Sequence, residues 1–254
     1  MITKEELKEY SKLMNLNLGQ AEKDYFQNIF LFIISQEYGN ELVFKGGTAL
    51  KKCFGLDRFS EDLDFSCREK VNFEKIEIGI KRFNIEYEFE KKEYERGLKL
   101  IFRLKGPLYV GVRSSLCRIE IDISFRENIL KNPIIKNIGR FLNELPSFEV
   151  LVMSEEEILA EKIRAIMSRE LARDVYDLWF LLNKGTKIDM EFIKNKLKYY
   201  NEEFDKNKFR KKLSEKKIIW KTELIPLLKK VPDFVEVKNY ILKEFKFKEE
   251  GLKN

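Results

Sequence analysis

Two short stretches decide the fold: KGGTALK at residues 45–51 and RFSEDLDF at residues 58–65. The apolar run at residues 42–44 predicts a strand directly before the first stretch, and residues 48–54 predict a helix. Glycines let a backbone approach a ligand closely, and the N-terminus of a helix presents free amides to an anion. A strand followed by Gly-Gly-Thr and a helix therefore predicts a turn that can receive a phosphate.

The second stretch places two carboxylates at strand spacing. Residues 63–66 predict a strand, so Asp62 and Asp64 point to one face while Leu63 and Phe65 point to the other. Two carboxylates one strand step apart can hold Mg²⁺ or Mn²⁺ at a phosphoryl-transfer site. Gly-Gly-Thr alone is usually a structural turn, and such an acidic pair alone is usually solvated. The two motifs together, in this order, predict a metal-dependent nucleotide site.

A third carboxylate is expected on a neighbouring strand. The sequence RIEIDIS at residues 118–124 alternates three isoleucines with three polar residues, Glu120, Asp122 and Ser124. We favour Asp122 over Glu120 as the third acid. An edge strand with water on one side would give the same alternation. The pattern therefore predicts a strand, and it does not by itself assign a catalytic role to Asp122.

The chain as a whole predicts an α/β fold of the α+β type, with two domains. Residues 1–150 combine helices within residues 5–37, broken at residues 17–19, with a mixed sheet of strands at 42–44, 63–66, 85–89, 98–104, 108–112, 116–124 and 148–152. Residues 151–254 are helical, and Ser154 with Glu157 predicts a capping box at the first helix. A second helix is expected from about residue 171 to 184, ending at Gly185, with later breaks near Pro226 and Pro232.

The composition excludes several kinds of chemistry. The 254 residues include no histidine, which removes Ser-His-Asp and Cys-His catalysis and histidine zinc sites. Three cysteines without a Cys-x-x-Cys pair predict a reducing, cytoplasmic compartment. The longest apolar run, residues 29–34, is far shorter than the roughly 20 residues that cross a bilayer, so we expect no membrane partner.

Positive charge is concentrated near the C-terminus. The formal net charge is +6, and residues 206–217 alone contain seven basic residues and one acidic residue. This stretch predicts an RNA-binding surface formed by Lys206, Lys208, Arg210, Lys211 and Lys212. A solvated amphipathic helix with Phe209 and Leu213 on its buried side is an equally good interpretation.

The quoted motifs resemble those of a known family. FKGGTALKKCFGLDRFSEDLDFS at residues 44–66 resembles the core of the AbiEii/AbiGii family of nucleotidyltransferase-like toxins, which belongs to the DNA polymerase β-like nucleotidyltransferase superfamily. SEEEILAEKIRAIMSRELARDVYDLWFLL at residues 154–182 resembles the helices of that family. The resemblance implies a polymerase β-like nucleotidyltransferase lobe and a C-terminal helical lobe that completes the active-site cleft. The superfamily usually has Gly-Ser where this chain has Gly47-Thr48, and threonine keeps the hydroxyl.

The resemblance also implies roles for individual residues. The metal ligands would be Asp62, Asp64 and Asp122, which would form the catalytic set together with Lys162 and Asp174. The nucleotide would be bound by Gly46, Gly47, Thr48, Lys162 and Asp177. By their position before the carboxylates, Arg58 and Ser60 are added to the nucleotide-binding set, although Ser60 is more often a loop cap. Asp174 and Asp177 share a helix face, which fits a structural Arg–Asp network equally well.

The implied function is metal-dependent transfer of a nucleoside monophosphate from an NTP to an acceptor hydroxyl. The acceptor would be tRNA, and the protein would be the toxin of a toxin–antitoxin or phage-defence pair with a cognate antitoxin. Alternatives are a nucleotidyltransferase that modifies a small molecule or a protein, a non-catalytic RNA-binding module of the same fold, and a metal-dependent ribonuclease.

Overall fold

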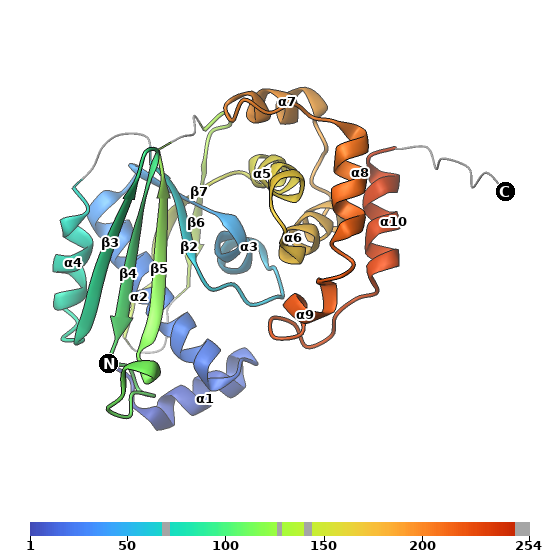
Figure 1. Cartoon of the computed structure of the whole chain (residues 1–254). Coiled ribbons are helices and arrows are strands. Elements are labelled where there is room, and N and C mark those ends of the chain that lie inside the picture. The colour runs from blue at the N-terminus through green and yellow to red at the C-terminus, as the bar shows by residue number, and fades with distance from the viewer. Residues whose placement is uncertain (68–71, 126–128, 140–143, 247–254) are drawn as a thin grey trace. The chain divides into compact units, whose positions relative to one another are not determined.

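The computed structural model describes residues 1–67, 72–125, 129–139 and 144–246, which form two compact units (Figure 1). The first unit comprises Met1–Gly55 and Phe59–Met153, and the second comprises Leu56–Arg58 and the chain from Ser154 onward. Because Leu56–Arg58, from the first half of the sequence, belong to the second unit, the two units are not simply consecutive along the chain.

The first unit is built on a seven-stranded mixed sheet with the strand order β3-β4-β5-β2-β1-β7-β6. The strands are β1 (Leu42–Lys45), β2 (Leu63–Cys67), β3 (Tyr87–Tyr94), β4 (Gly97–Leu104), β5 (Cys117–Ser124), β6 (Ile134–Ile138) and β7 (Phe148–Val152). Strand β2 runs parallel to β5 and antiparallel to β1, and β1 runs parallel to β7. The predicted mixed sheet flanked by helices is confirmed.

The centre of the sheet follows the alternation of the sequence. Along β5 the side chains of Ile119, Ile121 and Ile123 are buried, whereas Glu120 and Asp122 are half-buried on the other face. A strand with one face packed on the core shows this period of two. The polar face of β5 is therefore available for a site.

In its described residues, the first unit has the α-helices α1 (Lys4–Met14), α2 (Leu18–Tyr38), α3 (Gly46–Phe54) and α4 (Glu74–Lys81). Asn15 ends α1 in the left-handed conformation, with φ 60°, and Asn17 caps α2, which confirms the predicted break between two helices. Helix α2 packs across the sheet. The ring centroids of Phe30 and Phe102 of β4 are 4.7 Å apart, and those of Phe32 and Phe148 of β7 are 5.4 Å apart.

A buried ionic cluster fixes α3 against α2. Lys52 Nζ of α3 lies 2.8 Å from Asp24 Oδ1 and 2.8 Å from Asn28 Oδ1, both on α2. The Tyr10 hydroxyl of α1 donates a hydrogen bond to Asp24. A buried carboxylate is tolerated only when it is paired and hydrogen-bonded, and Asp24 is both. The three helices are thus joined at one carboxylate, which holds the helix that begins at Gly46.

Two details of the predicted sheet are wrong or shifted. The strand expected at residues 108–112 is absent, because the chain forms a turn at Gly106, where Tyr109 N donates to Gly106 O, and then reaches Gly111 with φ +87°. A left-handed residue interrupts the extended backbone that a strand needs. Strand β3 begins at Tyr87, two residues after the predicted start at Ile85, and runs on to Tyr94. Strand β6 and helix α4 were not anticipated.

The described part of the second unit is helical, as predicted. Its helices are α5 (Glu155–Ser168), α6 (Ala172–Asn183), α7 (Met190–Lys198), α8 (Lys206–Glu215), α9 (Trp220–Leu224) and α10 (Phe234–Glu244). Ser154 caps α5 by accepting a hydrogen bond from Glu157 N, while the buried Glu157 carboxylate accepts from Lys196 Nζ at 2.8 Å. Helix α6 ends just before Gly185, which has φ +91°.

Of the helices in the described ranges, none is both long enough and apolar enough to span a membrane.

Candidate active site

The turn from β1 into α3 has the form that the sequence predicts. Strand β1 ends at Lys45, and Gly46 opens α3 with φ +75°. Lys45 is the N-cap residue and provides no side-chain cap hydrogen bond to the helix. The first amides of α3 are therefore not capped by that residue, and the positive end of the helix dipole lies at the turn.

Asp64 of β2 lies directly over this turn. A Cβ atom built on Gly46 would lie 3.0 Å from Asp64 Cγ and closer still to Oδ2. Both the positive φ of Gly46 and the proximity of Asp64 require a residue without a side chain. Gly46 thus lets a carboxylate approach the N-terminus of α3.

Asp64 and Asp122 are neighbours across the sheet. The parallel register of β2 and β5 pairs Asp64 with Asp122, and both side chains are half-buried. Burial raises the pKa of the Asp122 carboxyl, the negative charges of Asp62 and Glu120 add to the rise, and Lys99 opposes it. The structure therefore aligns Asp64 with Asp122, and the charge of Asp62 acts on Asp122 as well.

Lys99 is a site residue that the sequence analysis missed. Its Nζ atom lies 2.9 Å from Glu120 Oε2 and 3.2 Å from Asp122 Oδ2. Burial alone would lower the pKa of Lys99, but these two carboxylates raise it, so the amine is charged. Lys99 lies opposite Asp122 in the β4–β5 register. The alternation of polar and apolar residues at 98–104 is the sequence signal that could have placed the Lys99 side chain on the polar face of the sheet.

The donor atoms of this group fit a hard divalent cation. Asp62, Asp64 and Asp122 offer carboxylate oxygens, which Mg²⁺ and Mn²⁺ prefer, and the described residues near them include no histidine or thiolate that would favour a softer metal. Within residues 1–67, 72–125, 129–139 and 144–246, no group of three or more acidic or cysteine side chains is already gathered tightly enough to hold an ion. Two observations support a cation here: the close approach of Asp64 to Gly46, and the alignment of Asp64 with Asp122.

The loop before β2 is held through its main chain. Thr48 is fully buried, and its hydroxyl donates to the Asp62 carbonyl at 2.5 Å. Ser60 is 9% exposed, and its carbonyl accepts from Gln27 Nε2 at 2.9 Å. The Thr48 hydroxyl, which we expected to contact the nucleotide, therefore holds the loop that carries Asp62.

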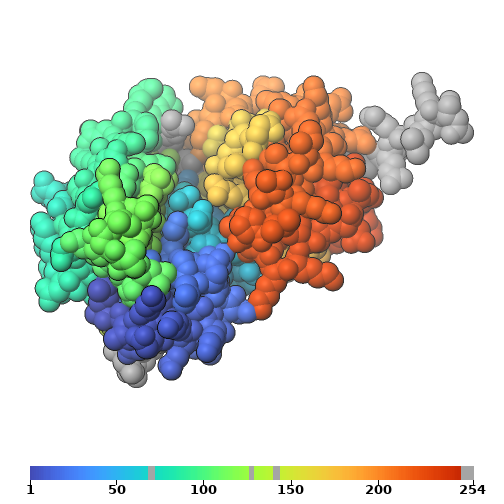
Figure 2. Space-filling view, turned by 60° about the horizontal axis from the view of Figure 1, so that its bottom comes forward, coloured from blue at the N-terminus to red at the C-terminus, as the bar shows by residue number. Residues whose placement is uncertain are grey.

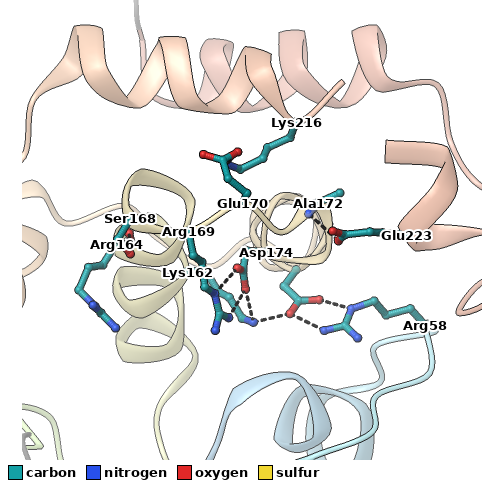
Figure 3. A network of polar contacts seen from close by, with 11 residues as sticks. Arg58, Lys162, Arg164, Ser168, Arg169, Glu170, Ala172, Asp174, Lys216 and Glu223 are labelled. Atoms are coloured by element: carbon teal, nitrogen blue, oxygen red, sulfur yellow. Dashed lines mark hydrogen bonds and ion pairs between the residues drawn. The ribbon is translucent and has the colours of Figure 1, made fainter. Parts of the chain in front are cut away.

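Four further predicted site residues meet in the second unit (Figure 3). The Arg58 guanidinium donates to both carboxylate oxygens of Asp177, at 2.6 and 2.7 Å. Lys162 Nζ lies 2.6 Å from Asp177 Oδ2 and 2.9 Å from Asp174 Oδ1. Arg169, which the sequence analysis did not single out, donates to Asp174 at 2.7 and 2.8 Å. The Arg–Asp network considered from the sequence is present, and the roles of these residues at a nucleotide stay predictions.

This network keeps its buried charges ionised. Asp174 and Asp177 are both fully buried, which alone would raise the pKa of each carboxyl. Lys162 and Arg169 outweigh burial at Asp174, and Arg58 and Lys162 outweigh it at Asp177, so both pKa values lie below the ordinary range. Three cations, Arg58, Lys162 and Arg169, thus contact the two carboxylates.

The basic stretch divides into two sets of side chains. Phe209 and Leu213 of α8 are fully buried, as the amphipathic interpretation predicts. Lys212 and the buried Lys216 both bind Glu170, at 2.8 and 2.7 Å, and their hydrogen bonds lower the pKa of Glu170 to about 2. Lys206, Lys208 and Lys211 are exposed, and Arg210 is half-buried, in the segment coloured orange in Figure 2. All five predicted RNA-binding residues therefore reach the solvent at least in part, and Lys212 also supports the α5–α6 loop.

Comparisons with known proteins give a family match and a set of similar folds. The profile of the family described as "Nucleotidyl transferase AbiEii toxin, Type IV TA system" matches residues 29–245. The solved structure of MenT4, nucleotidyltransferase toxin Rv2826c from Mycobacterium tuberculosis H37Rv, has a TM-score of 0.67 and 19% identity, covering 96% of this chain and 89% of that one. JHP933 from Helicobacter pylori has a TM-score of 0.60 and 19% identity, covering 89% and 90%.

A curated sequence is also similar. The uncharacterized protein aq_aa25 from Aquifex aeolicus (strain VF5) is 28% identical over 155 residues, which are 60% of this chain. The match spans 63% of that relative, which is less than two thirds of its length. At these identities the solved structures show the shared fold.

Gly46→Ala tests the contact between α3 and Asp64. We expect Gly46→Ala to lose Mn²⁺ binding, because the new methyl group would displace the Asp64 carboxylate. Gly55→Ala is the matched control: Gly55 ends the same helix at φ +86°, but a methyl group there meets no atom within 4 Å. Both variants should lose about 1–2 kcal/mol of stability from backbone strain. Equal Mn²⁺ affinity in the two variants, measured by electron paramagnetic resonance, would contradict the assignment.

Lys162→Met tests the buried network. Removing this cation takes away a charge partner of both Asp174 and Asp177. We therefore expect the free energy of unfolding, measured with urea at neutral pH, to fall by about 3–5 kcal/mol. Exposed Lys221→Met should change stability by less than about 0.5 kcal/mol.

The same variant has an expected pH dependence. The depressed pKa values of Asp174 and Asp177 contribute stability above the unfolded value of about 3.9, and this contribution is lost as the pH falls below it. The stability difference between wild type and Lys162→Met should therefore shrink in acid. A difference that stays constant from pH 7 to pH 3 would show that the two carboxylates do not depend on Lys162.

Proposed function

This chain belongs to the AbiEii nucleotidyl transferase toxin family of type IV toxin–antitoxin systems, and from this membership we propose that it is a metal-dependent enzyme that transfers a nucleoside monophosphate from an NTP to an acceptor hydroxyl. The observation that carries the proposal is the pairing of Asp64 with Asp122 on adjacent strands, beside the glycine turn that opens α3. Carboxylates paired in this way beside a helix N-terminus suit a metal ion and a triphosphate.

The carboxylates and the glycine turn would have different roles in the reaction. Asp62, Asp64 and Asp122 would hold Mg²⁺ or Mn²⁺, which would neutralise the charge that develops on the phosphate oxygens. The first amides of α3, at Gly46 and Gly47, would bind phosphate oxygens of the NTP. Thr48 would act by holding the loop of Asp62, through its hydrogen bond to the Asp62 carbonyl.

The reaction would proceed by in-line displacement. The acceptor oxygen attacks the α-phosphorus, a new P–O bond forms, the bond to the β-phosphate bridging oxygen breaks, and pyrophosphate leaves. The hydroxyl proton would pass to Asp122, which we propose as the general base from its place beside Asp64 on the adjacent strand. A chain without histidine cannot use an imidazole base.

The second unit would supply a cationic group for phosphate. Arg58, Lys162 and Arg169 carry three positive charges against the two negative charges of Asp174 and Asp177. Of these three cations, we propose Lys162 as the residue that meets the nucleotide phosphates. Asp174 and Asp177 would orient it.

The acceptor that we propose is tRNA. The exposed cations of α8 would contact its phosphate backbone, because clustered lysine and arginine side chains bind polyanions. The protein would act in the cytoplasm as the toxin of its pair, and a cognate antitoxin would restrain it. Family membership supports the toxin role.

Label transfer tests the catalytic assignment. Purified protein with Mg²⁺, tRNA and each α-labelled NTP in turn should place label on tRNA from one NTP. Asp64→Asn should lower the rate by roughly a thousandfold, since it removes a metal ligand worth several kcal/mol. Asp189→Asn, which keeps a residue able to cap α7, should match wild type. Undiminished transfer by Asp64→Asn would refute the site.

Charge removal on α8 tests the acceptor surface. The double variant Lys208→Gln/Lys211→Gln should raise the KM for tRNA with little change in kcat and should reduce the salt dependence of binding by about 1 per lysine removed. Lys4→Gln/Lys8→Gln, an exposed pair on α1, provides the control. An unchanged KM and salt slope in the α8 variant would exclude this helix from RNA binding.

A further inference from the structure

Gln27 is a buried amide in the middle of α2, outside every motif of the sequence. Its side chain is fully buried. Its Nε2 atom donates two hydrogen bonds, to Ser60 O at 2.9 Å and to Glu61 O at 2.8 Å. One amide group thus uses both of its N–H bonds on two successive carbonyls, 33 and 34 residues away in the sequence.

The orientation of this amide is fixed by its partners. A flipped amide would set the Gln27 oxygen against two carbonyl oxygens, which would repel it. In the observed orientation, Gln27 Oε1 is buried and has no hydrogen-bond partner among the described residues. An unsatisfied buried acceptor is costly, so the two bonds to the loop are the interactions that account for a glutamine at this place.

A third hydrogen bond continues the series. The Thr48 hydroxyl, at the start of α3, donates to the carbonyl of Asp62. Three successive carbonyls, those of Ser60, Glu61 and Asp62, are therefore held by side chains from two helices. The backbone on both sides of the Glu61–Asp62 peptide is fixed before the chain enters β2.

The strand pairing of the sheet does not include Asp62, and these three hydrogen bonds hold the backbone next to it. The paired residues of β2 and β5 begin at Leu63, which is aligned with Ile121, and the pairing of β1 with β2 reaches only to Asp64. Asp64 and Asp122 are set by strand register, whereas Asp62 lies one residue outside the sheet.

We propose that Gln27 is a positioning residue, which holds the loop at residues 60–61 so that the Asp62 carboxylate faces the Asp64–Asp122 pair. This inference rests on the proposed function, in which those three carboxylates hold the metal ion. Gln27 touches neither metal nor nucleotide; it acts through the main chain of the loop. Groups that orient metal ligands in this way typically change metal affinity by roughly 10- to 100-fold when they are removed.

Gln27→Met and Gln27→Asn test the proposal. Methionine has nearly the length of glutamine but no donor, and it also removes the unsatisfied Oε1; asparagine keeps the amide but is one methylene too short to reach both carbonyls. Gln36→Met, on the exposed side of the same helix, is the matched control. The probes are Mn²⁺ alone, titrated by electron paramagnetic resonance, and hydrogen–deuterium exchange of the peptide that contains residues 59–63.

We expect both Gln27 variants to bind Mn²⁺ roughly 10- to 100-fold more weakly than wild type and Gln36→Met, with faster exchange in residues 59–63. The kcat of label transfer should fall while the KM for tRNA stays constant. A role limited to stability would lower the unfolding midpoint but would leave the Mn²⁺ affinity of the folded protein unchanged.

The outcomes separate the two proposals. Wild-type Mn²⁺ affinity in folded Gln27→Met and Gln27→Asn, beside a wild type that binds Mn²⁺ and transfers label, would overturn the role of Gln27 and leave the proposed function intact. A wild type that binds no Mn²⁺ would overturn the metal-dependent function, and the role of Gln27 would fall with it. Weaker Mn²⁺ binding in both Gln27 variants, with Gln36→Met unchanged, would establish the role.

Discussion

Asp64 and Asp122 lie next to each other because the parallel register of β2 and β5 aligns them, and the other groups of the site lie around this pair. Lys99 of β4 forms an ion pair with Asp122, while burial together with the nearby acids Asp62 and Glu120 raises the pKa of Asp122. Gly46 brings the positive end of α3 to the same place. The sheet thus places acidic side chains close together, and a divalent cation would neutralise their negative charge.

The parts of this arrangement that are local in sequence could be predicted from the sequence. The Gly-Gly-Thr turn and the alternation of residues 118–124 each depend on neighbours within a few positions, and both are present. The strand expected at residues 108–112 shows the limit of this reasoning, because the left-handed Gly111 overrides a locally apolar pattern. Strand register could not be predicted, since the alignment of Asp64 with Asp122 is set by the packing of the whole sheet.

The side-chain partners of the predicted residues are the other part that the sequence could not provide. The Thr48 hydroxyl is directed to the Asp62 carbonyl, and Gln27 meets its loop partners across more than 30 residues. A signal for Gln27 was present, because an amide stands in a helix whose neighbours are almost all buried, but its partner carbonyls carry no mark in the sequence. In the same way, the basic composition of residues 206–217 does not distinguish the exposed Lys208 from the buried Lys216, which binds Glu170.

The acidic side chains of the two units have pKa values shifted in opposite directions. In the first unit, burial, Asp62 and Glu120 raise the pKa of Asp122, and Lys99 opposes them. In the second unit, three cations surround Asp174 and Asp177, and the two carboxyl groups have depressed pKa values. A carboxyl group whose pKa is raised by burial and by neighbouring acids is stabilised as a carboxylate by an added cation. Carboxylates already paired with arginine and lysine are ionised without one, so the first unit, and not the second, has the electrostatic environment that favours a metal ion.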